Sequence, residues 1–253
     1  MGNRIDTFRK RLRNHETIAG TFIKTPSSIV AEVLGLSQLD VVCIDAEHAP
    51  FGRLETDQCI AAFRAADMPC LVRIPGDSPH DIRNALDSGA TGILVPHVTS
   101  ADQAAAVVKA ANFGEGGRGY AGSPRAAAYT TKRMNDHLSD SRDQTTVIVQ
   151  IEDLAALDHV EAISAVDGVD AVFVGRVDLS VAMREPVSSK PVIDVIERVC
   201  SVARGAGTTV GMFTPSLEEL PSWKDHGASL FLLDSDQGFL LEGARQLAHS
   251  VRD

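Results

Sequence analysis

The chain has 253 residues, of which 44% are hydrophobic and 23% are charged, so it is too apolar for a disordered protein and large enough for one sizeable core. Its 24 Lys and Arg residues stand against 34 Asp and Glu residues, a formal net charge of −10 at pH 7, which disfavours nucleic acid as a partner because phosphate backbones are bound through cationic side chains. No run approaches the roughly 18 apolar residues of a membrane span, and no secretion signal follows the basic start, so we expect a cytoplasmic protein with no membrane partner.

The predicted elements begin with a short amphipathic helix within residues 1–17, because Ile5, Phe8 and Leu12 have helical spacing. After it, eight short β-rich runs alternate with helix-like segments. The predicted strands are 18–23, 39–44, 70–74, 92–95, 146–151, 169–174, 209–213 and 229–233. The predicted helices are 26–34, 54–66, 79–86, 101–111, 154–165, 192–206, 217–226 and 238–250.

The predicted strands are apolar almost throughout, as in VVCI (41–44), GILV (92–95) and LFLL (230–233). Parallel strands that are buried on both faces have this pattern. Eight such strands alternating with helices predict an α/β protein of one domain, a closed (β/α)8 TIM barrel spanning residues 1–253. The long segment 113–144 interrupts the alternation and is predicted to be a loop or insertion.

Segment 113–144 also contains an apparent motif that we discount. Gly114, Gly116 and Gly119 fit G-x-G-x-x-G, but a dinucleotide-binding fingerprint follows a strand and opens a helix. Here the glycines follow the predicted helix 101–111. We interpret the segment as a loop in which glycine turns hold Arg118.

Polar residues gather where the predicted strands end, and active sites of such barrels are built at that end. These residues are Asp45, Glu47 and His48 after the second strand, Arg73 at the third, Gln150 and Glu152 at the fifth and Asp178 after the sixth. Glu152 and Asp178 come from adjacent strands, so their carboxylates can converge on one hard divalent cation. The alternative is a pair of ordinary polar residues that bind Arg176 or Arg73.

Three further residues are candidates for moving protons or binding charge. His48 lies on a predicted exposed turn and suits proton transfer near neutral pH, although it can equally be an ordinary turn histidine. Asp87 can orient His48 across the barrel mouth, but its position in LDSGA favours a helix C-terminal residue. Arg73 ends an apolar strand, and a buried guanidinium requires an anionic partner, either an aspartate or a substrate.

Several motifs together resemble the metal-dependent class II pyruvate aldolases of the 4-hydroxy-2-oxoheptanedioate and 2-keto-3-deoxy-sugar-acid aldolase family. They are IDAEHAP (44–50), VRIP (72–75), LDSGATGILVPHV (86–98), GGRGY (116–120), VQIED (149–153) and VFVGRVDLS (172–180). The resemblance extends from about residue 19 to residue 246. It implies a TIM barrel that assembles as a hexamer, a trimer of dimers, with the C-terminal helix exchanged between neighbouring subunits.

The resemblance implies a metal and a carboxylate site. Glu152 and Asp178 would bind Mg²⁺ or Mn²⁺, with Co²⁺, Ni²⁺ or Zn²⁺ as other possible ions. The carboxylate of the keto acid would be held by Gln150 and by the backbone near Gly175, Arg176, Val177 and Asp178. The family commonly has G-P-A-D-L-S where this chain has GRVDLS (175–180), and the change puts a bulky cation beside the carboxylate pocket.

The resemblance also implies the catalytic residues. Arg73 would steady a developing enolate, and His48 paired with Asp87 would move protons. Asp45 would lie behind these residues, without contacting the substrate, and would help to position them.

The implied reaction cleaves or forms a 4-hydroxy-2-oxo acid, with pyruvate or hydroxypyruvate and an aldehyde as the smaller components, through a metal-stabilised enolate. A Schiff-base route needs a desolvated lysine, and only Lys24 lies at the end of a predicted strand, so that route is disfavoured. Two alternatives stay open. One is a lyase of the citrate or malyl thioester type, and the other is a barrel that binds a keto acid without catalysis.

Overall fold

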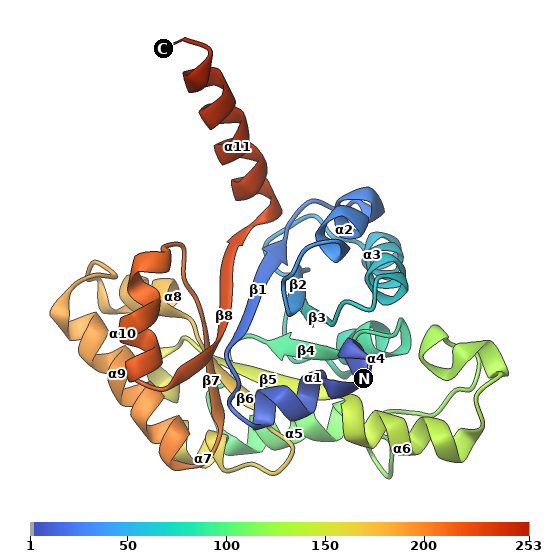
Figure 1. Ribbon diagram of the computed structural model, residues 1–253. Helices are drawn as coiled ribbons and strands as arrows, with labels where there is room; N and C mark the ends of the chain where they lie inside the picture. Colours follow the sequence, from blue (N-terminus) through green and yellow to red (C-terminus); the bar gives the residue numbers. More distant parts are fainter. Residues whose placement is uncertain (1–2, 253) are drawn as a thin grey trace.

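The computed structural model describes residues 3–252, so residues 1–2 of the predicted N-terminal segment, and residue 253, lie outside the described residues. Within the described chain, eight parallel strands form a closed barrel in the order β1 to β8 (Figure 1). Each strand pairs with the next along the chain, and β8 pairs with β1. The predicted (β/α)8 barrel is confirmed.

The strands lie close to their predicted positions. They are β1 (Ile18–Ile23), β2 (Val41–Asp45), β3 (Cys70–Arg73), β4 (Gly92–Val95), β5 (Thr146–Ile151), β6 (Ala171–Val174), β7 (Thr209–Phe213) and β8 (Ala228–Ser235). Apolar runs that are buried on both faces therefore identified all of the barrel strands, with bounds that differ by at most two residues.

The helices surround this barrel, apart from the first and the last. They are α1 (Arg4–Arg13), α2 (Ser28–Gly35), α3 (Arg53–Ala65), α4 (Pro79–Asp87), α5 (Ala101–Ala111), α6 (Met134–Gln144), α7 (Val160–Ser164), α8 (Arg176–Met183), α9 (Lys190–Gly205), α10 (Leu220–Asp225) and α11 (Asp236–Ser250), with short 3-10 helices η1 (Arg125–Thr130), η2 (Leu154–Ala156) and η3 (Leu217–Glu219). Helix α8 has no counterpart among the predicted helices, and α6 lies within the segment 113–144 that was predicted to be a loop or insertion.

Two apolar clusters lie on opposite sides of the sheet. Along β2, Val41 and Cys43 belong to the cluster inside the barrel, whereas Val42 and Ile44 belong to the cluster beneath the helices. Side chains alternate between the two faces of a strand. The next inward position of β2 is Asp45, so this alternation directs a carboxylate into the mouth of the barrel.

Helix α1 closes the amino-terminal end of the barrel. Phe8 and Leu12 are fully buried and join the apolar cluster inside the barrel. The helix is also fixed by an ion pair, in which Arg9 Nε lies 2.9 Å from the buried Oδ1 of Asp170. The predicted N-terminal helix therefore serves as a plug for the barrel interior.

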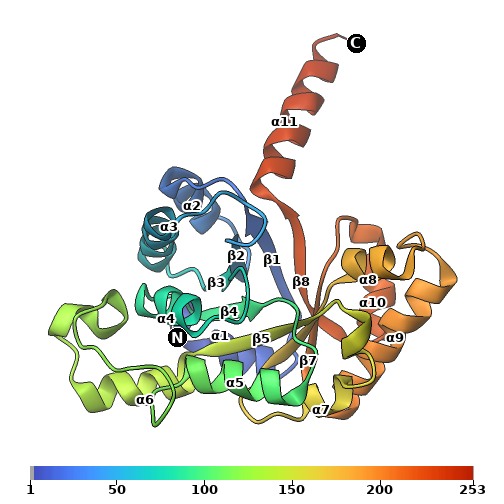
Figure 2. The ribbon, with the colours of Figure 1, turned by 180° about the vertical axis from the view of Figure 1, so that it is seen from behind.

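Helix α11 leaves the barrel, and both views show it projecting into open space (Figures 1 and 2). Its apolar residues Leu240 and Leu247 are 76% and 72% exposed. On the barrel, α2 also exposes apolar side chains, with Ile29 at 70% and Val33 at 63%. In a complete (β/α)8 ring, the helix after β8 would lie next to α2, so both faces lack the neighbour that this architecture normally provides.

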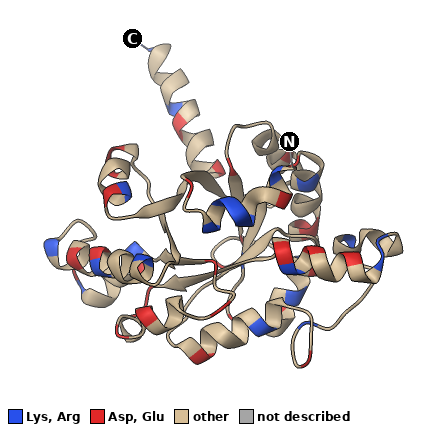
Figure 3. Ribbon diagram, turned by 60° about the horizontal axis from the view of Figure 1, so that its bottom comes forward, with Lys and Arg blue, Asp and Glu red and all other residues tan. Residues whose placement is uncertain are grey.

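No helix in the described residues is long and apolar enough to span a bilayer. On the side of the molecule shown in Figure 3, Lys and Arg residues are interspersed with Asp and Glu residues. The charges on that side therefore do not form a continuous basic surface.

We expect Phe8→Ala to lower the free energy of unfolding by about 3–5 kcal/mol, because it empties a buried aromatic position inside the barrel. Lys10→Ala, on the exposed side of the same helix, should change it by less than about 0.5 kcal/mol. Urea unfolding followed by circular dichroism measures both. Equal effects of the two substitutions would contradict the role of α1 as a plug.

Candidate active site

The carboxyl ends of the strands surround a cavity of about 310 Å³. Its lining residues are Phe22, Lys24, His48, Arg73, Gln150, Phe173, Val174, Gly175, Arg176, Val177, Asp178 and Phe213. Most of the residues predicted for the site therefore face one cavity. Asp45 and Glu152 lie directly behind this lining, as their contacts show.

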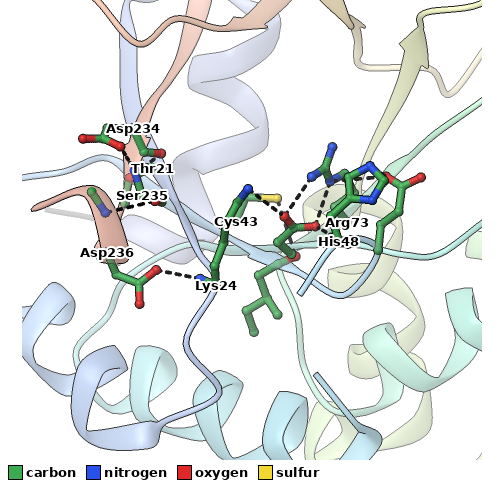
Figure 4. A network of polar contacts seen from close by, with 12 residues as sticks. Thr21, Lys24, Cys43, His48, Arg73, Asp234, Ser235 and Asp236 are labelled. Carbon is green, nitrogen blue, oxygen red and sulfur yellow. Dashed lines mark hydrogen bonds and ion pairs between the residues drawn. The ribbon is translucent and has the colours of Figure 1, made fainter. Parts of the chain in front are cut away.

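Asp45 and Arg73 form a buried ion pair between β2 and β3, within the polar network shown in Figure 4. Arg73 Nε donates to Oδ1 of Asp45 at 3.1 Å and Nη2 donates to Oδ2 at 2.8 Å. Lys24 Nζ lies 3.5 Å from Oδ2. The anionic partner that Arg73 requires is therefore Asp45.

Several contacts determine the charge state of Asp45. Burial alone would raise the pKa of this carboxyl, but the hydrogen bonds and charge of Arg73 outweigh burial and hold the pKa below its ordinary value. The backbone N–H of His48 donates to Oδ1 at 3.1 Å. Asp45 thus stays ionised and anchors both Arg73 and the turn that carries His48.

Glu47 is a site residue to which the sequence analysis gave no role. Its Oε2 lies 3.4 Å from Arg73 Nε and 3.6 Å from His48 Nε2, yet this buried atom has no hydrogen-bond partner in the described chain. The imidazole of His48 is largely exposed, with 59% of its side chain accessible. The position of Glu47, two residues after the end of β2, is the feature of the sequence from which a role in the site could have been predicted.

Glu152 is buried at the end of β5. Its Oε1 accepts a hydrogen bond of 2.9 Å from the backbone N–H of His97, and its Oε2 accepts one from the side-chain amide of Gln150. Gly175 permits this packing, because a Cβ atom at that position would come within 2.5 Å of the Cβ of Glu152. Burial raises the pKa of Glu152, His97 opposes the rise, and the charges of Asp178 and Glu47 add to it.

The acids of this cluster have few cationic partners, and the ion pair that Glu152 forms in the described chain is with His97, whose Nδ1 lies 3.2 Å from Oε1. Among the described residues, no ion pair is formed by Asp178, and no cluster of three or more His, Cys, Asp or Glu residues is arranged as a metal site. Glu152 and Asp178 nevertheless supply carboxylate oxygens, and the buried Oε1 of Gln150 has no partner. This all-oxygen donor set fits a hard divalent cation completed by water and substrate.

Among the described residues Arg176 forms no ion pair with Glu152 or Asp178, so the pairing considered for it in the alternative reading of these acids is not present. Its Nη2 lies 2.6 Å from Oε2 of Glu219 on η3, and its guanidinium stacks 4.8 Å from the ring centre of Trp223. Trp223 Nε1 donates to the same carboxylate at 3.1 Å. The bulky cation is therefore directed toward α10, while the Arg176 backbone stays at the start of α8 beside the cavity.

The structure does not bring Asp87 to His48 within one chain. Asp87 is the last residue of α4, and barrel helices run back from the mouth toward the amino-terminal ends of the strands. Burial raises the pKa of Asp87, and the charged neighbours that oppose the rise are Arg118, Arg83 and Arg53. A pairing between Asp87 and His48 would therefore require a second subunit.

The fold and the cluster of acids and arginine at the carboxyl ends of the strands define a (β/α)8-barrel enzyme. Residues 19–240 match the HpcH/HpaI aldolase/citrate lyase family, and the chain belongs to this family. It is a carbon–carbon lyase, as the resemblance of its motifs predicted.

Named relatives match this chain over nearly its whole length. The hydroxypyruvate/pyruvate aldolase of Paraburkholderia phytofirmans is 32% identical, with 96% of each chain covered. The 4-hydroxy-2-oxovalerate aldolase of Rhodococcus jostii is 34% identical, covering 98% of this chain and 96% of the relative. The crystal structure of an HpcH/HpaI aldolase/citrate lyase family protein from Burkholderia cenocepacia is similar with a TM-score of 0.93 and 32% identity, over 98% of this chain and 100% of that one.

We expect Asp45→Asn to destabilise the protein by about 3–5 kcal/mol at pH 7, because it removes the carboxylate that accepts both hydrogen bonds of the buried Arg73 and leaves only the more distant Glu47 as a counter-ion. The native pKa of Asp45 lies below its ordinary value. Its contribution is therefore complete above the unfolded pKa of about 3.9 and is lost as the pH falls through the lower native value.

Urea unfolding between pH 3 and pH 7 measures this contribution. Below about pH 4 the wild type should lose stability more steeply than the Asp45→Asn variant. Asp158→Asn, at a side chain that is 86% exposed, should keep the wild-type slope. Parallel curves for the wild type and Asp45→Asn would overturn the assignment.

Proposed function

We propose that this chain is a divalent-metal-dependent aldolase that cleaves or forms 4-hydroxy-2-oxo acids, with pyruvate or hydroxypyruvate and an aldehyde as the smaller components. The observation that carries the proposal is the separation of charges at the barrel mouth. Arg73 is bound to Asp45, whereas Glu152 lies beside Asp178 and, among the described residues, forms an ion pair with His97 and with no arginine. The names of the relatives support the same substrate class.

The carboxylate of the keto acid would bind at the start of α8. The first N–H groups of a helix have no partner within the helix and attract anions. Gly175, Arg176 and Val177 line the cavity at this point, and Gln150 faces it from β5. Unlike the proline of the resembled motif, Arg176 has a backbone N–H to donate.

Glu152 and Asp178 would hold the ion, Mg²⁺ or Mn²⁺ in the first instance, which supplies Lewis-acid polarisation of the keto-acid oxygens when it is bound. Arg73 lines the same cavity and is already oriented by Asp45. It would stabilise the negative charge that develops on the ketone oxygen, and its fixed orientation means that little reorganisation is needed during the reaction.

His48 would move the proton in this reaction. As the bond between C3 and C4 breaks, the C4 hydroxyl loses its proton to the imidazole and becomes the aldehyde carbonyl. The electron pair of the broken bond passes to the pyruvate enolate, which then takes up a proton at C3. Glu47, 3.6 Å from His48 Nε2, is the carboxylate within this chain that can orient the ring. A role for Asp87 would arise only between subunits.

We also propose a hexamer, a trimer of dimers, in which α11 is exchanged between neighbours. The exposed apolar residues of α11 and of α2 support this assembly, because the helix of one subunit can cover the uncovered face of another. The four cysteines are buried and form no disulfide, which agrees with the reducing cytoplasm that we expect for this protein.

We expect exhaustive chelation to abolish retro-aldol and oxaloacetate decarboxylase activity, and Mg²⁺ or Mn²⁺ to restore it. Glu152→Gln should lower kcat by about 10³-fold, equivalent to about 4 kcal/mol of transition-state stabilisation. Asp153→Asn, at the adjacent and more exposed acid, should retain activity within about threefold. A coupled assay of pyruvate release measures these changes.

Activity that survives chelation would contradict the metal-dependent aldolase. Turnover of a citrate-type thioester in place of free keto acids would favour the thioester lyase. Binding of pyruvate without proton exchange at its methyl group would favour the non-catalytic barrel.

We expect the double substitution Leu240→Asp and Leu247→Asp to dissociate the assembly, because it places charges on the exposed apolar face of α11. Sedimentation velocity should show a loss of the largest species at micromolar concentration. Glu242→Ala, a polar position on the same helix, should leave the oligomer unchanged. A wild-type monomer at all concentrations would overturn the proposed exchange.

A further inference from the structure

A second cavity, of about 80 Å³, lies at the opposite end of the barrel from the candidate active site. Its wall includes Thr91 and Thr145, which directly precede β4 and β5. Strand β5 has six residues and rises about 3.3 Å per residue, so the two ends of the barrel are about 20 Å apart. The other polar wall residues include Arg64, Arg118, Lys132, His137, Asp140 and Ser141.

Arg118 is buried in this wall with only part of its guanidinium satisfied. The side chain is 5% exposed, and Nη2 donates to Ser141 Oγ at 3.0 Å. One face of the guanidinium stacks on Phe113, 3.8 Å from the ring centre. Its Nε has no hydrogen-bond partner in the described chain. Burial lowers the pKa of Arg118 to about 10, and the charge of Asp87 opposes the change.

His137, on α6, is a second buried group with an unpaired nitrogen. It is 4% exposed, and its Nδ1 has no partner among the described residues. Its ring packs against Phe113 and Tyr120. The charged groups facing it are Arg118, Lys132 and Asp140. Burial lowers the pKa of His137, the two cations lower it further, and Asp140 opposes them.

The positive charge in this wall is only partly neutralised within the described chain, since Lys132 Nζ lies 2.5 Å from Oδ2 of the wall residue Asp140, whereas the two arginines of the wall have no such partner. The other two buried arginines have carboxylate partners, since Arg73 has Asp45 and Arg176 has Glu219. In the described chain neither Arg118 nor Arg64 forms an ion pair, and Arg64 Nη1 donates only to the carbonyl of Gly89. In a protein of net charge −10, two arginines beside one cavity without a carboxylate contact point to an anionic ligand.

We propose that this cavity binds a phosphate group, held by Arg118 and Lys132, with His137 and the hydroxyls of Ser141 and Thr145 as further donors. The donors come from the glycine-rich loop, from α6 and from the residue before β5, so they surround the cavity. Phosphate carries more negative charge and more acceptor oxygens than a carboxylate, so it can use more of these donors. A single water needs only about 10–15 Å³ of such space, so the cavity is large enough for a polyatomic ion.

The test uses the full chain and sodium orthophosphate, with sodium chloride at matched ionic strength as the reference. Nuclear magnetic resonance titration of the His137 imidazole should show a higher pKa in phosphate, and the thermal midpoint should rise. Lys132→Met should weaken the phosphate effect at least tenfold. Arg133→Met, the neighbouring cation whose side chain is 85% exposed, should leave it unchanged.

Arg118→Lys keeps the charge and should weaken binding less than Arg118→Met. If Arg118→Met does not fold, the phosphate titration of the Lys132→Met variant and the His137 pKa of the wild type still test the proposal. Glycerol phosphate in place of orthophosphate distinguishes a phosphate monoester from the free ion. Acetate that binds as well as phosphate, or a His137 pKa that does not respond to phosphate, would overturn the proposal. None of these measurements depends on aldolase activity, so a failure of the phosphate site can be distinguished from a failure of the proposed function.

Discussion

The buried ion pair between Asp45 and Arg73 is the interaction on which the candidate site depends. Parallel pairing of β2 with β3 places these two residues side by side, as register partners at the last positions of their strands. Both point into the barrel mouth because they continue the inward alternation of Cys43 and Leu71. The pair compensates the burial of each charge, and it directs a guanidinium into the cavity.

The arginine of this pair forms no ion pair with Glu152 or Asp178 among the described residues. Arg73 is bound to Asp45, and Arg176 is bound to Glu219 and stacked on Trp223. Glu152 and Asp178 therefore lie near two arginines without being neutralised by either. An acid pair in this environment retains affinity for a cation, whereas an acid pair clasped by arginine would not.

The sequence predicted the barrel and most of the site because both depend on local pattern. Apolar runs identified the strands, and the rule that such barrels build their active sites at the carboxyl ends of the strands then pointed to Gln150 and Glu152. The direction of Arg176 was not predictable, since its partner Glu219 lies 43 positions away in the chain and tertiary packing brings the two together. Asp87 was placed at the mouth on family resemblance, whereas the direction of α4 puts it at the far end of its helix.

The link between α11 and β1 connects the proposed assembly with the site. At the start of α11, Asp236 accepts a hydrogen bond of 2.6 Å from the backbone N–H of Lys24 (Figure 4) and one of 3.1 Å from the backbone N–H of Thr25. Ser235 caps the helix by accepting from the N–H of Gly238. These contacts fix the point at which α11 leaves the barrel, and they lie on the segment that carries Lys24 toward Asp45. If a neighbouring subunit shifts α11 in the proposed assembly, the shift is therefore passed to Lys24, the residue after β1. The side chain of Lys24 contacts Asp45, which orients Arg73.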